Sequence, residues 1–253
     1  MDAASSADAL AELLSIAYDS SSRVMLPAAL DPMDAAGAYE VQQRMLKKCA
    51  LATGGWKIGA KSPSGPIQGA PLPLARIYGS RASLARSDYP VLGLELELYF
   101  TFDRDFLPQA RPLPEREVLA AIGAIGASIE IVSSRISGWP QVPKLSQLAD
   151  LQNNGALVTG GMIDYRSGFS YDEPSLDLSI GGLPLFSGAG RNPAGDPRRL
   201  LCWLVNHCRE SGLPLPKGSI ITTGSYTGLE FPATAGTVTG EIEGLPAVTF
   251  ELL

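Results

Sequence analysis

The sequence predicts an α+β fold in which a helical N-terminal part is attached to a larger β-rich body. Apolar residues recur at helical spacing at the start of the chain, and the pattern changes to period-two alternation in GLELELYF from Gly93 onward. Further alternating runs, separated by glycine, fill the C-terminal end after Lys217. We therefore expect residues 1–53 to form the helical part and residues 54–253 the catalytic body, as one structural unit overall.

Two helices are expected in the N-terminal part. The first carries small and apolar residues at helical spacing between Ala9 and Ala17. The second begins at Asp31-Pro32, where a capping residue precedes a proline at the first helical position, and Gly54-Gly55 stops it. A short strand follows from Trp56, and the Pro/Gly-rich stretch 62–78 is interpreted as an irregular functional loop or lid.

In the body, VLGLELELYFTF from Val91 alternates apolar and acidic residues and predicts a strand. Residues 114–126 favour a helix with acidic residues near its start, and the glycine-rich loop SGAGRNPAGDP precedes another helix that ends near Ser211. Further strands are expected at 128–132, at 156–159, and in the C-terminal segments SIITTGSYTG, TVTGEIEG and PAVTFELL, the last two forming a hairpin around Gly244.

Composition excludes several classes of protein. The net charge of −6 argues against nucleic-acid or anionic-membrane binding, which requires a basic face. The three cysteines, Cys49, Cys202 and Cys208, include no CxxC pair and fit a reducing compartment without a disulfide framework or zinc site. The first residues lack the basic and apolar regions of a signal peptide, and no apolar run reaches the roughly 20 residues of a membrane span. A soluble, cytoplasmic protein is expected.

Three glutamates are candidate metal ligands. Glu95 and Glu97 lie two apart on a predicted strand, so both carboxylates project from one face. Such a pair is either a solvated outer face or a site with a cation between its carboxylates. Glu130 lies in the apolar run ASIEIV, where a buried carboxylate needs a partner. Mg²⁺ or Mn²⁺ suits three carboxylates, and a structural salt bridge of Glu130 with Arg135 is the alternative.

Lys57 is the candidate acid/base. It lies between Trp56 and Ile58 in the apolar strand GWKIG, where a lysine can transfer a proton or hold a substrate carboxylate, unless it simply extends to solvent. Lys61 is the competing candidate nearby.

The remaining polar groups have weaker patterns. In GSYTG, the hydroxyls of Ser225 and Thr227 form either an ordinary turn or an anion contact. The glycines of SGAGRNPAGDP follow no GxGxxG strand–turn pattern and precede no Walker lysine, so a nucleotide loop is discounted. The single histidine, His207, is expected to pack or lie at the surface, which argues against Ser-His-Asp or Cys-His hydrolysis.

Taken in order, these segments resemble the 2-keto-4-pentenoate hydratase group of the fumarylacetoacetate hydrolase superfamily. AYEVQQR resembles the helix before the first strand of that group, GWKIGAKS its GYKIG-T-S strand, GLELELYF its E-x-E metal strand, and ASIEIVSSRISGW its third-ligand strand and following loop. Counterparts of LADLQNNGALVTGG, SGAGRNPAGDPRRLLCWLVN and TTGSYTG follow in the same order, so the resemblance covers nearly the whole chain.

The resemblance implies a mixed β-roll, barrel-like body with the N-terminal helices packed against it. It implies a divalent metal, Mg²⁺ or Mn²⁺, on the three glutamates, with Lys57 at the substrate and a homo-oligomeric assembly. Members of the group hydrate 2-hydroxy-dienoates, or decarboxylate related 2-oxo diacids, in the degradation of aromatic compounds. Substrate-binding positions are expected at Lys61, Asp150, Ser225 and Thr227.

Two departures from the family pattern lie where substrate choice is set. The family often has Asp-Asn-Ala-Ser where this chain has Asp150-Leu151-Gln152-Asn153, and the loop after Lys57 lacks the acidic and aromatic residues expected near the substrate. A hydratase acting on a small 2-oxo acid is the first hypothesis. The alternatives are a 2-oxo diacid decarboxylase or tautomerase, and a catalytically silent metal-binding paralogue. Carbon–carbon hydrolysis is disfavoured because no histidine precedes His207.

Overall fold

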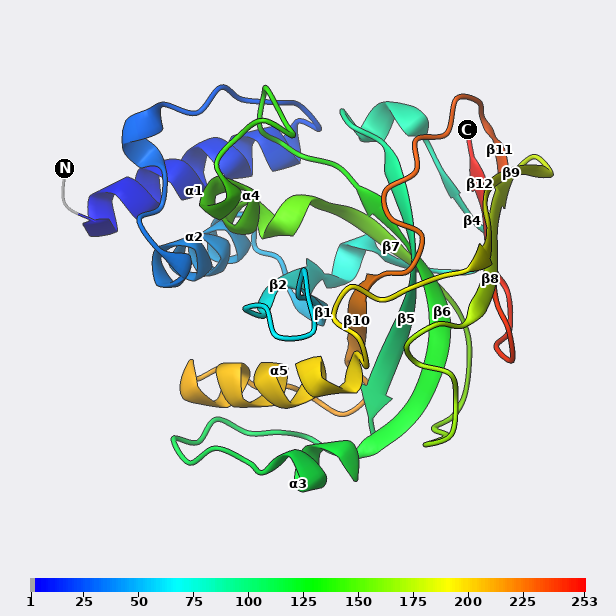
Figure 1. The fold of residues 1–253 in the computed structure, drawn as a ribbon. Helices are drawn as coiled ribbons and strands as arrows, with labels where there is room; N and C mark the ends of the chain where they lie inside the picture. The colour runs from blue at the N-terminus through cyan, green and yellow to red at the C-terminus, as the bar shows by residue number, and fades with distance from the viewer. Residues whose placement is uncertain (1–2) are drawn as a thin grey trace.

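The computed structural model describes residues 3–253 and places two helices at the N-terminal end (Figure 1). Helix α1 spans Ala3–Asp19 and α2 spans Ala35–Lys48. The predicted start of the second helix at Asp31 is wrong, because Asp34 is the capping residue and its carboxylate accepts a hydrogen bond of 2.8 Å from the Gly37 N–H. Residues 1 and 2, which were expected to belong to the helical segment, lie outside the described residues.

The strands of residues 3–253 form two sheets. The larger sheet has seven strands in the order β2-β1-β10-β5-β6-β7-β3, and the smaller has five in the order β4-β12-β11-β8-β9. The strands of the larger sheet are β1 Thr53–Gly59, β2 Gln68–Pro73, β3 Ile77–Gly79, β5 Gly93–Phe102, β6 Ile122–Val132, β7 Asn154–Asp164 and β10 Ile220–Ser225. Those of the smaller sheet are β4 Ala82–Leu84, β8 Ser175–Ile180, β9 Leu183–Ala189, β11 Gly236–Ile242 and β12 Val248–Leu252.

Short helices lie around the larger sheet. They are α3 Glu115–Leu119, α4 Lys144–Ala149 and α5 Arg198–Glu210, with single turns η1 Ala28–Leu30, η2 Leu74–Arg76, η3 Arg86–Asp88 and η4 Leu151–Asn153. Figure 1 shows α1, α2 and α4 grouped on one side of the curled sheet, opposite the smaller sheet. The Gln42 amide of α2 donates to the carbonyls of Gly69 and Leu148, at 3.2 and 2.7 Å, and so joins the N-terminal helices to β2 and α4.

Long-range pairing corrects several predicted boundaries. The stretch 62–78 is not wholly irregular, because β2 within it pairs antiparallel with β1 and β3 pairs with β7. The helix predicted over 114–126 contains only α3, since β6 begins at Ile122 and pairs with the full length of β5. The strand expected at 156–159 likewise extends over all of β7, and β8 was not predicted.

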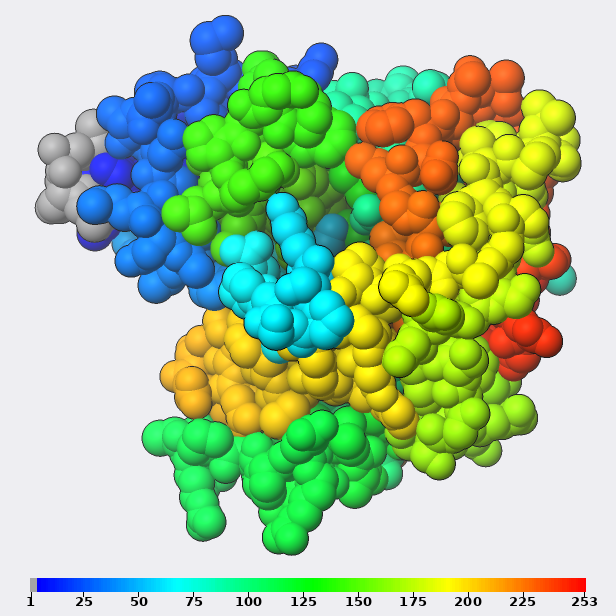
Figure 2. All heavy atoms as spheres, in the orientation of Figure 1, coloured from blue at the N-terminus to red at the C-terminus, as the bar shows by residue number. Residues whose placement is uncertain are grey.

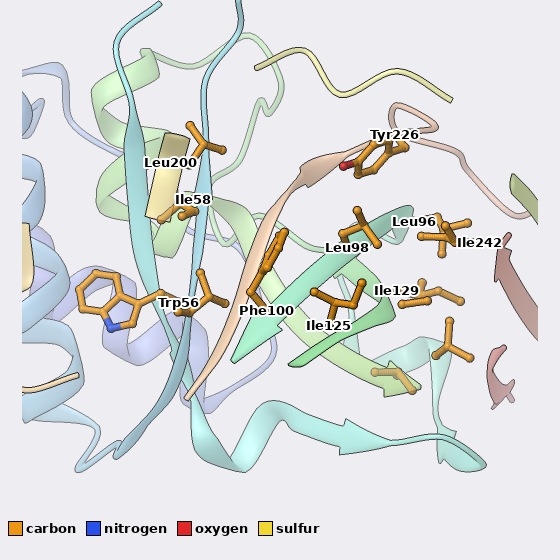
Figure 3. Close-up of a cluster of buried hydrophobic side chains, with 14 of the residues drawn as sticks. Trp56, Ile58, Leu96, Leu98, Phe100, Ile125, Ile129, Leu200, Tyr226 and Ile242 are labelled. Atoms are coloured by element: carbon orange, nitrogen blue, oxygen red, sulfur yellow. The ribbon is translucent and has the colours of Figure 1, made fainter. Parts of the chain in front are cut away.

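One buried apolar cluster includes the facing sides of the two sheets, and a second lies among α1, α2 and α4. Leu94, Leu96 and Leu98 are completely buried, and Figure 3 shows Leu96 and Leu98 beside Ile129 of β6 and Ile242 of β11. A Cβ added at Gly240 of β11 would come within 2.7 Å of a Leu96 methyl carbon, so the sheets are in close contact there. Because side chains alternate along a strand, the acidic residues of β5 project from the opposite face of the larger sheet.

Among the described residues 3–253, no helix has both the length and the apolar composition that a membrane crossing requires. The division of the chain into a helical segment up to residue 53 and a body from residue 54 onward stays a prediction.

Candidate metal and substrate site

The three predicted glutamates meet on adjacent strands. Glu95 of β5 lies directly opposite Glu130 of β6, and Glu97 is two residues further along β5. One carboxylate oxygen of each lies within 4.8 Å of the others. Glu97 and Glu130 are buried and Glu95 is half-buried, so the cluster opens to one side.

Lys57 of β1 faces this cluster. Its Nζ lies 2.6 Å from Glu130 Oε1 and donates a 3.1 Å hydrogen bond to the carbonyl oxygen of Gln152. The side chain is buried and therefore does not extend to solvent. The salt bridge considered for Glu130 with Arg135 does not form, because the Arg135 guanidinium pairs with Asp150 instead.

The electrostatics of the cluster are those of crowded carboxylates. Burial, followed by repulsion from Glu130, raises the pKa of Glu95 to about 7, and the same causes raise the pKa of Glu97 to about 8. Burial alone would lower the pKa of Lys57, but the three glutamates outweigh it and raise that pKa above its usual value. One ammonium therefore faces three carboxylates. A further cation would offset the negative charge that the ammonium leaves unbalanced.

The residues fit a hard divalent metal. Asn154 Nδ2 donates to Glu130 Oε1 at 3.0 Å, so this oxygen is shared by two donors. The other oxygen, Glu130 Oε2, is buried without a hydrogen-bond partner, which is costly unless a cation or water completes it. Glu97 Oε2 accepts a 3.2 Å hydrogen bond from the Gly224 N–H, which fixes that carboxylate. All candidate ligand atoms are oxygens, the donors that such cations prefer.

A cavity of about 520 Å³ opens above the cluster. Figure 2 shows the hollow at the centre of the visible face, between the cyan loop after β1, the green α4 region, and yellow and orange segments. Its lining residues are Lys57, Ile58, Gly59, Ala60, Lys61, Pro66, Gln68, Glu95, Glu97, Lys144, Gln152, Arg191, Pro193, Gly224, Ser225 and Gly228. A volume of this size suits a small organic acid.

Two of the four expected substrate-binding residues, Lys61 and Ser225, line the cavity. Thr227 does not line it. Its hydroxyl accepts from the Leu96 N–H at 3.3 Å and donates to the Gly228 carbonyl at 2.8 Å, so it fixes the turn. Asp150 is also absent from the lining, because it is completely buried and its carboxylate is taken up by Arg135. The expected contact of Asp150 with substrate is therefore corrected to a structural contact.

Several cavity residues were not singled out from the sequence. Lys144 begins α4, Arg191 lies between β9 and α5, and Gln68 begins β2. Asn154 contacts Glu130 from the first position of β7. Arg191 and Asn154 lie in segments that carry the family resemblance, but the residues themselves were not singled out, and an exposed Lys or Arg is usually only solvated.

His207 is a packing residue, as predicted. Its ring stacks on Trp203 with centroids 4.8 Å apart and lies 4.7 Å from the ring of Tyr39. Burial lowers the pKa of His207, which favours its neutral form. It does not line the cavity.

Two hydratases are similar to the chain in sequence, although no family model matches it. A 2-hydroxyhexa-2,4-dienoate hydratase from Comamonas testosteroni is 30% identical over 142 residues, which cover 56% of this chain and 52% of the relative. A 2-keto-4-pentenoate hydratase from Paraburkholderia phymatum is 27% identical over 226 residues, which cover 85% of each. The chain is thus similar in sequence to the 2-keto-4-pentenoate hydratase group. The predicted resemblance is thus confirmed, and the relatives that carry it are named as hydratases, which are lyases. The match spans about half of the first relative and most of the second.

Two solved structures illustrate the fold that this chain shares with known proteins. The 4-oxalocrotonate decarboxylase from Pseudomonas putida G7, complexed with magnesium and adipate, matches with a TM-score of 0.83 at 20% identity, covering 98% of this chain and 97% of that chain. A fumarylpyruvate hydrolase from Pseudomonas aeruginosa, in complex with Mn²⁺ and pyruvate, matches with a TM-score of 0.53 at 12% identity, covering 78% and 88%. These likenesses confirm the predicted α+β fold of the fumarylacetoacetate hydrolase type.

Proposed function

We propose that this chain is a divalent-metal-dependent hydro-lyase that adds water to a 2-hydroxy-dienoate or the related 2-oxo-enoate in aromatic-compound catabolism. The observation that carries the proposal is the convergence of Glu95, Glu97 and Glu130 with a buried Lys57 at the floor of the cavity. The hydratases among its relatives support the same reaction class.

The three glutamates would hold Mg²⁺ or Mn²⁺. Their oxygen ligands suit either cation, and both metals are named with solved structures of the same fold. When bound, the metal acts as a Lewis acid toward the oxygens of a 2-oxo acid and stabilises negative charge that develops there. Such a cation would be bound by Glu130 Oε2, which has no hydrogen-bond partner, and by the half-buried Glu95.

Lys57 would hold the proton that moves during the reaction. Its Nζ is fixed by Glu130 Oε1 and the Gln152 carbonyl, and it lines the cavity in which substrate would lie. A proton held at Nζ can be transferred to the substrate carbon as the dienol becomes a ketone, and the proton of the enol hydroxyl replaces it at Nζ. Water then adds across the remaining double bond, with its hydroxyl on the distal carbon and its proton on the adjacent carbon. Lys61 is exposed at the cavity, which favours a role in holding the substrate rather than in proton transfer.

A second candidate is a 2-oxo diacid decarboxylase or tautomerase. Lys61, Lys144 and Arg191 line the cavity in addition to Lys57, although the chain as a whole carries a charge of −6. A monoacid would direct its one carboxylate to the metal and make no use of these cations, of which Arg191 already pairs with Glu173. A substrate with a second carboxylate would use them.

The deciding experiment is turnover by metal-stripped protein on 2-hydroxypenta-2,4-dienoate, with and without Mg²⁺ or Mn²⁺. Metal-dependent loss of the dienol absorbance, with formation of the 4-hydroxy-2-oxo acid, is the expected result. Release of carbon dioxide from a matched diacid, with no hydration of the dienoate, would show that the protein is a decarboxylase instead. Metal binding without turnover of either compound would leave a catalytically silent paralogue.

The expected assembly is a homo-oligomer, the expected partner is a small 2-oxo acid, and the expected location is the cytoplasm. Light scattering of the purified protein at several concentrations tests whether it is a homo-oligomer. A monomer at every concentration would contradict it.

A further inference from the structure

Three consecutive residues beside the site have a left-handed backbone. Leu151, Gln152 and Asn153 have φ angles of 46°, 53° and 59°, and none of them is glycine. Residues with a Cβ avoid this region because the Cβ approaches the following carbonyl oxygen too closely. A run of three therefore persists only where the surrounding structure holds it.

Arg135 holds this turn at both ends. Its Nη2 donates to the Asp150 carbonyl at 2.7 Å, and its Nη1 donates to the Asn154 carbonyl at 2.8 Å. The buried Asp150 carboxylate accepts from Arg135 Nε and, at 2.9 Å, from the Arg135 N–H. Within the turn, the Asn153 N–H donates to the Asp150 carbonyl at 2.8 Å. One guanidinium thus joins the residue before the turn to the residue after it.

The turn and the residue that follows it contact both members of the Lys57–Glu130 ion pair. The Gln152 carbonyl accepts from Lys57 Nζ at 3.1 Å, and the Asn154 amide donates to Glu130 Oε1 at 3.0 Å. A right-handed path through Gln152 would turn its carbonyl in a different direction, because φ and ψ set the orientation of the peptide plane. The left-handed turn is what aims this carbonyl at Lys57.

We propose that Arg135 and Asp150 are positioning residues that lock the left-handed turn 151–153 and thereby orient Lys57 for proton transfer. The inference rests on the proposed function for the role of Lys57. Neither residue lines the cavity, so they act through the turn and not on the substrate. The candidate metal ligands lie on β5 and β6, and the only one of them that the locked segment contacts is Glu130, through Asn154. Metal affinity should therefore depend less on the lock than kcat does.

Asp150→Asn tests the lock, because it keeps the side-chain size and removes the charge that holds Arg135. We expect kcat to fall about tenfold or more, while KM and the Kd for Mg²⁺ stay within about threefold. If Asp150→Asn does not fold, Arg135→Lys replaces it, since lysine keeps the charge but cannot bridge both carbonyls. An unchanged kcat, or losses in metal affinity as large as those in kcat, would overturn the proposal.

A glycine rescue separates the lock from a general structural role. Glycine adopts the left-handed region without strain. In the Asp150→Asn background, Gln152→Gly should therefore restore kcat by about threefold or more, whereas the matched Gln152→Ala, which also removes the side chain, should not. If Gln152→Gly and Gln152→Ala change kcat equally, Asp150 does not act by offsetting backbone strain at the turn.

Hydrogen exchange keeps this test separate from the proposed function. The N–H groups of Asn153 and Ser133 donate within the locked segment, to the carbonyls of Asp150 and Asn153 at 2.8 Å each. Both should exchange faster in Asp150→Asn and slow again with Gln152→Gly. Absence of turnover in the unaltered protein would refute the proposed function while exchange still tests the lock. Unchanged exchange in Asp150→Asn would refute the lock even in an active enzyme.

Discussion

Lys57 Nζ lies 2.6 Å from Glu130 Oε1, although the two residues are 73 positions apart in the chain. The pair joins the candidate proton carrier on β1 to the candidate metal ligand on β6. Because one Glu130 oxygen is taken by Lys57 and Asn154, the other oxygen is left for a cation. Substitutions at the two positions should therefore have opposite consequences for metal affinity.

Glu130→Ala should weaken Mg²⁺ or Mn²⁺ binding by about 100-fold or more while the fold is retained, because one of three charged ligands is lost. Calorimetric titration of metal-stripped protein measures the affinity, and circular dichroism checks the fold. Glu117→Gln, an exposed carboxylate on α3, is the matched control and should leave the affinity unchanged. Unaltered metal affinity in Glu130→Ala would remove this residue from the cage.

Lys57→Gln should lower kcat by about 10²- to 10⁴-fold, the usual contribution of a positioned acid/base. Metal affinity should stay the same or increase, because the ammonium that shares Glu130 with the cation is gone. Lys61→Gln is the comparison, and it should change KM more than kcat. A larger loss of kcat in Lys61→Gln than in Lys57→Gln would transfer the proton role to Lys61.

Metal affinity should fall as the pH is lowered from 8.5 to 6. The pKa of Glu95 is raised to about 7 and that of Glu97 to about 8, so protons compete with the cation throughout this range. We expect a loss of at least about tenfold, with proton release on binding measurable in buffers of different ionisation enthalpy. A pH-independent affinity with no proton release would contradict the raised pKa values.

The same pKa shifts set the stability of the metal-free protein. Carboxyls with a raised pKa bind more protons in the folded than in the unfolded state between their ordinary pKa of about 4.3 and about 8. Folding stability should therefore decrease as the pH rises through this range. The melting temperature without metal should fall from pH 6 to pH 9, and added Mg²⁺ should raise it more at pH 9. If added Mg²⁺ raised the melting temperature more at pH 6 than at pH 9, the predicted pH dependence would be contradicted.

The cavity cations should discriminate diacids from monoacids. Lys61→Gln, Lys144→Gln and Arg191→Gln should each weaken binding of 2-oxoadipate to the Mg²⁺-loaded protein by about three- to tenfold if the second carboxylate lies among them. Binding of 2-oxohexanoate should be unaffected, and Lys217→Gln, an exposed cation outside the cavity, is the control. Equal effects on the two acids would speak against the diacid candidate.

The ligand pattern could be predicted from the sequence because strand alternation is local. Period two puts Glu95 and Glu97 on one face, and a carboxylate amid isoleucines indicates that Glu130 is buried.

Strand β2 was expected to be part of an irregular loop, and its composition explains why. Pro71 and Pro73 give it the composition of a loop, yet β2 is the edge strand of the larger sheet, where missing N–H donors are tolerated.

The sequence alone determined the α+β class, because helical spacing and period-two alternation are local patterns. It also indicated the three glutamates as candidate metal ligands and Lys57 as the candidate acid/base, through the ordered resemblance of its segments to a known family. Only the tertiary structure decided which distant groups meet. Arg135 pairs with Asp150 and leaves Glu130 to Lys57, and the cations at positions 61, 144 and 191 line one cavity. The physical reason is that strand register and chain reversal bring segments together through long-range hydrogen bonds and core packing, which no local pattern encodes.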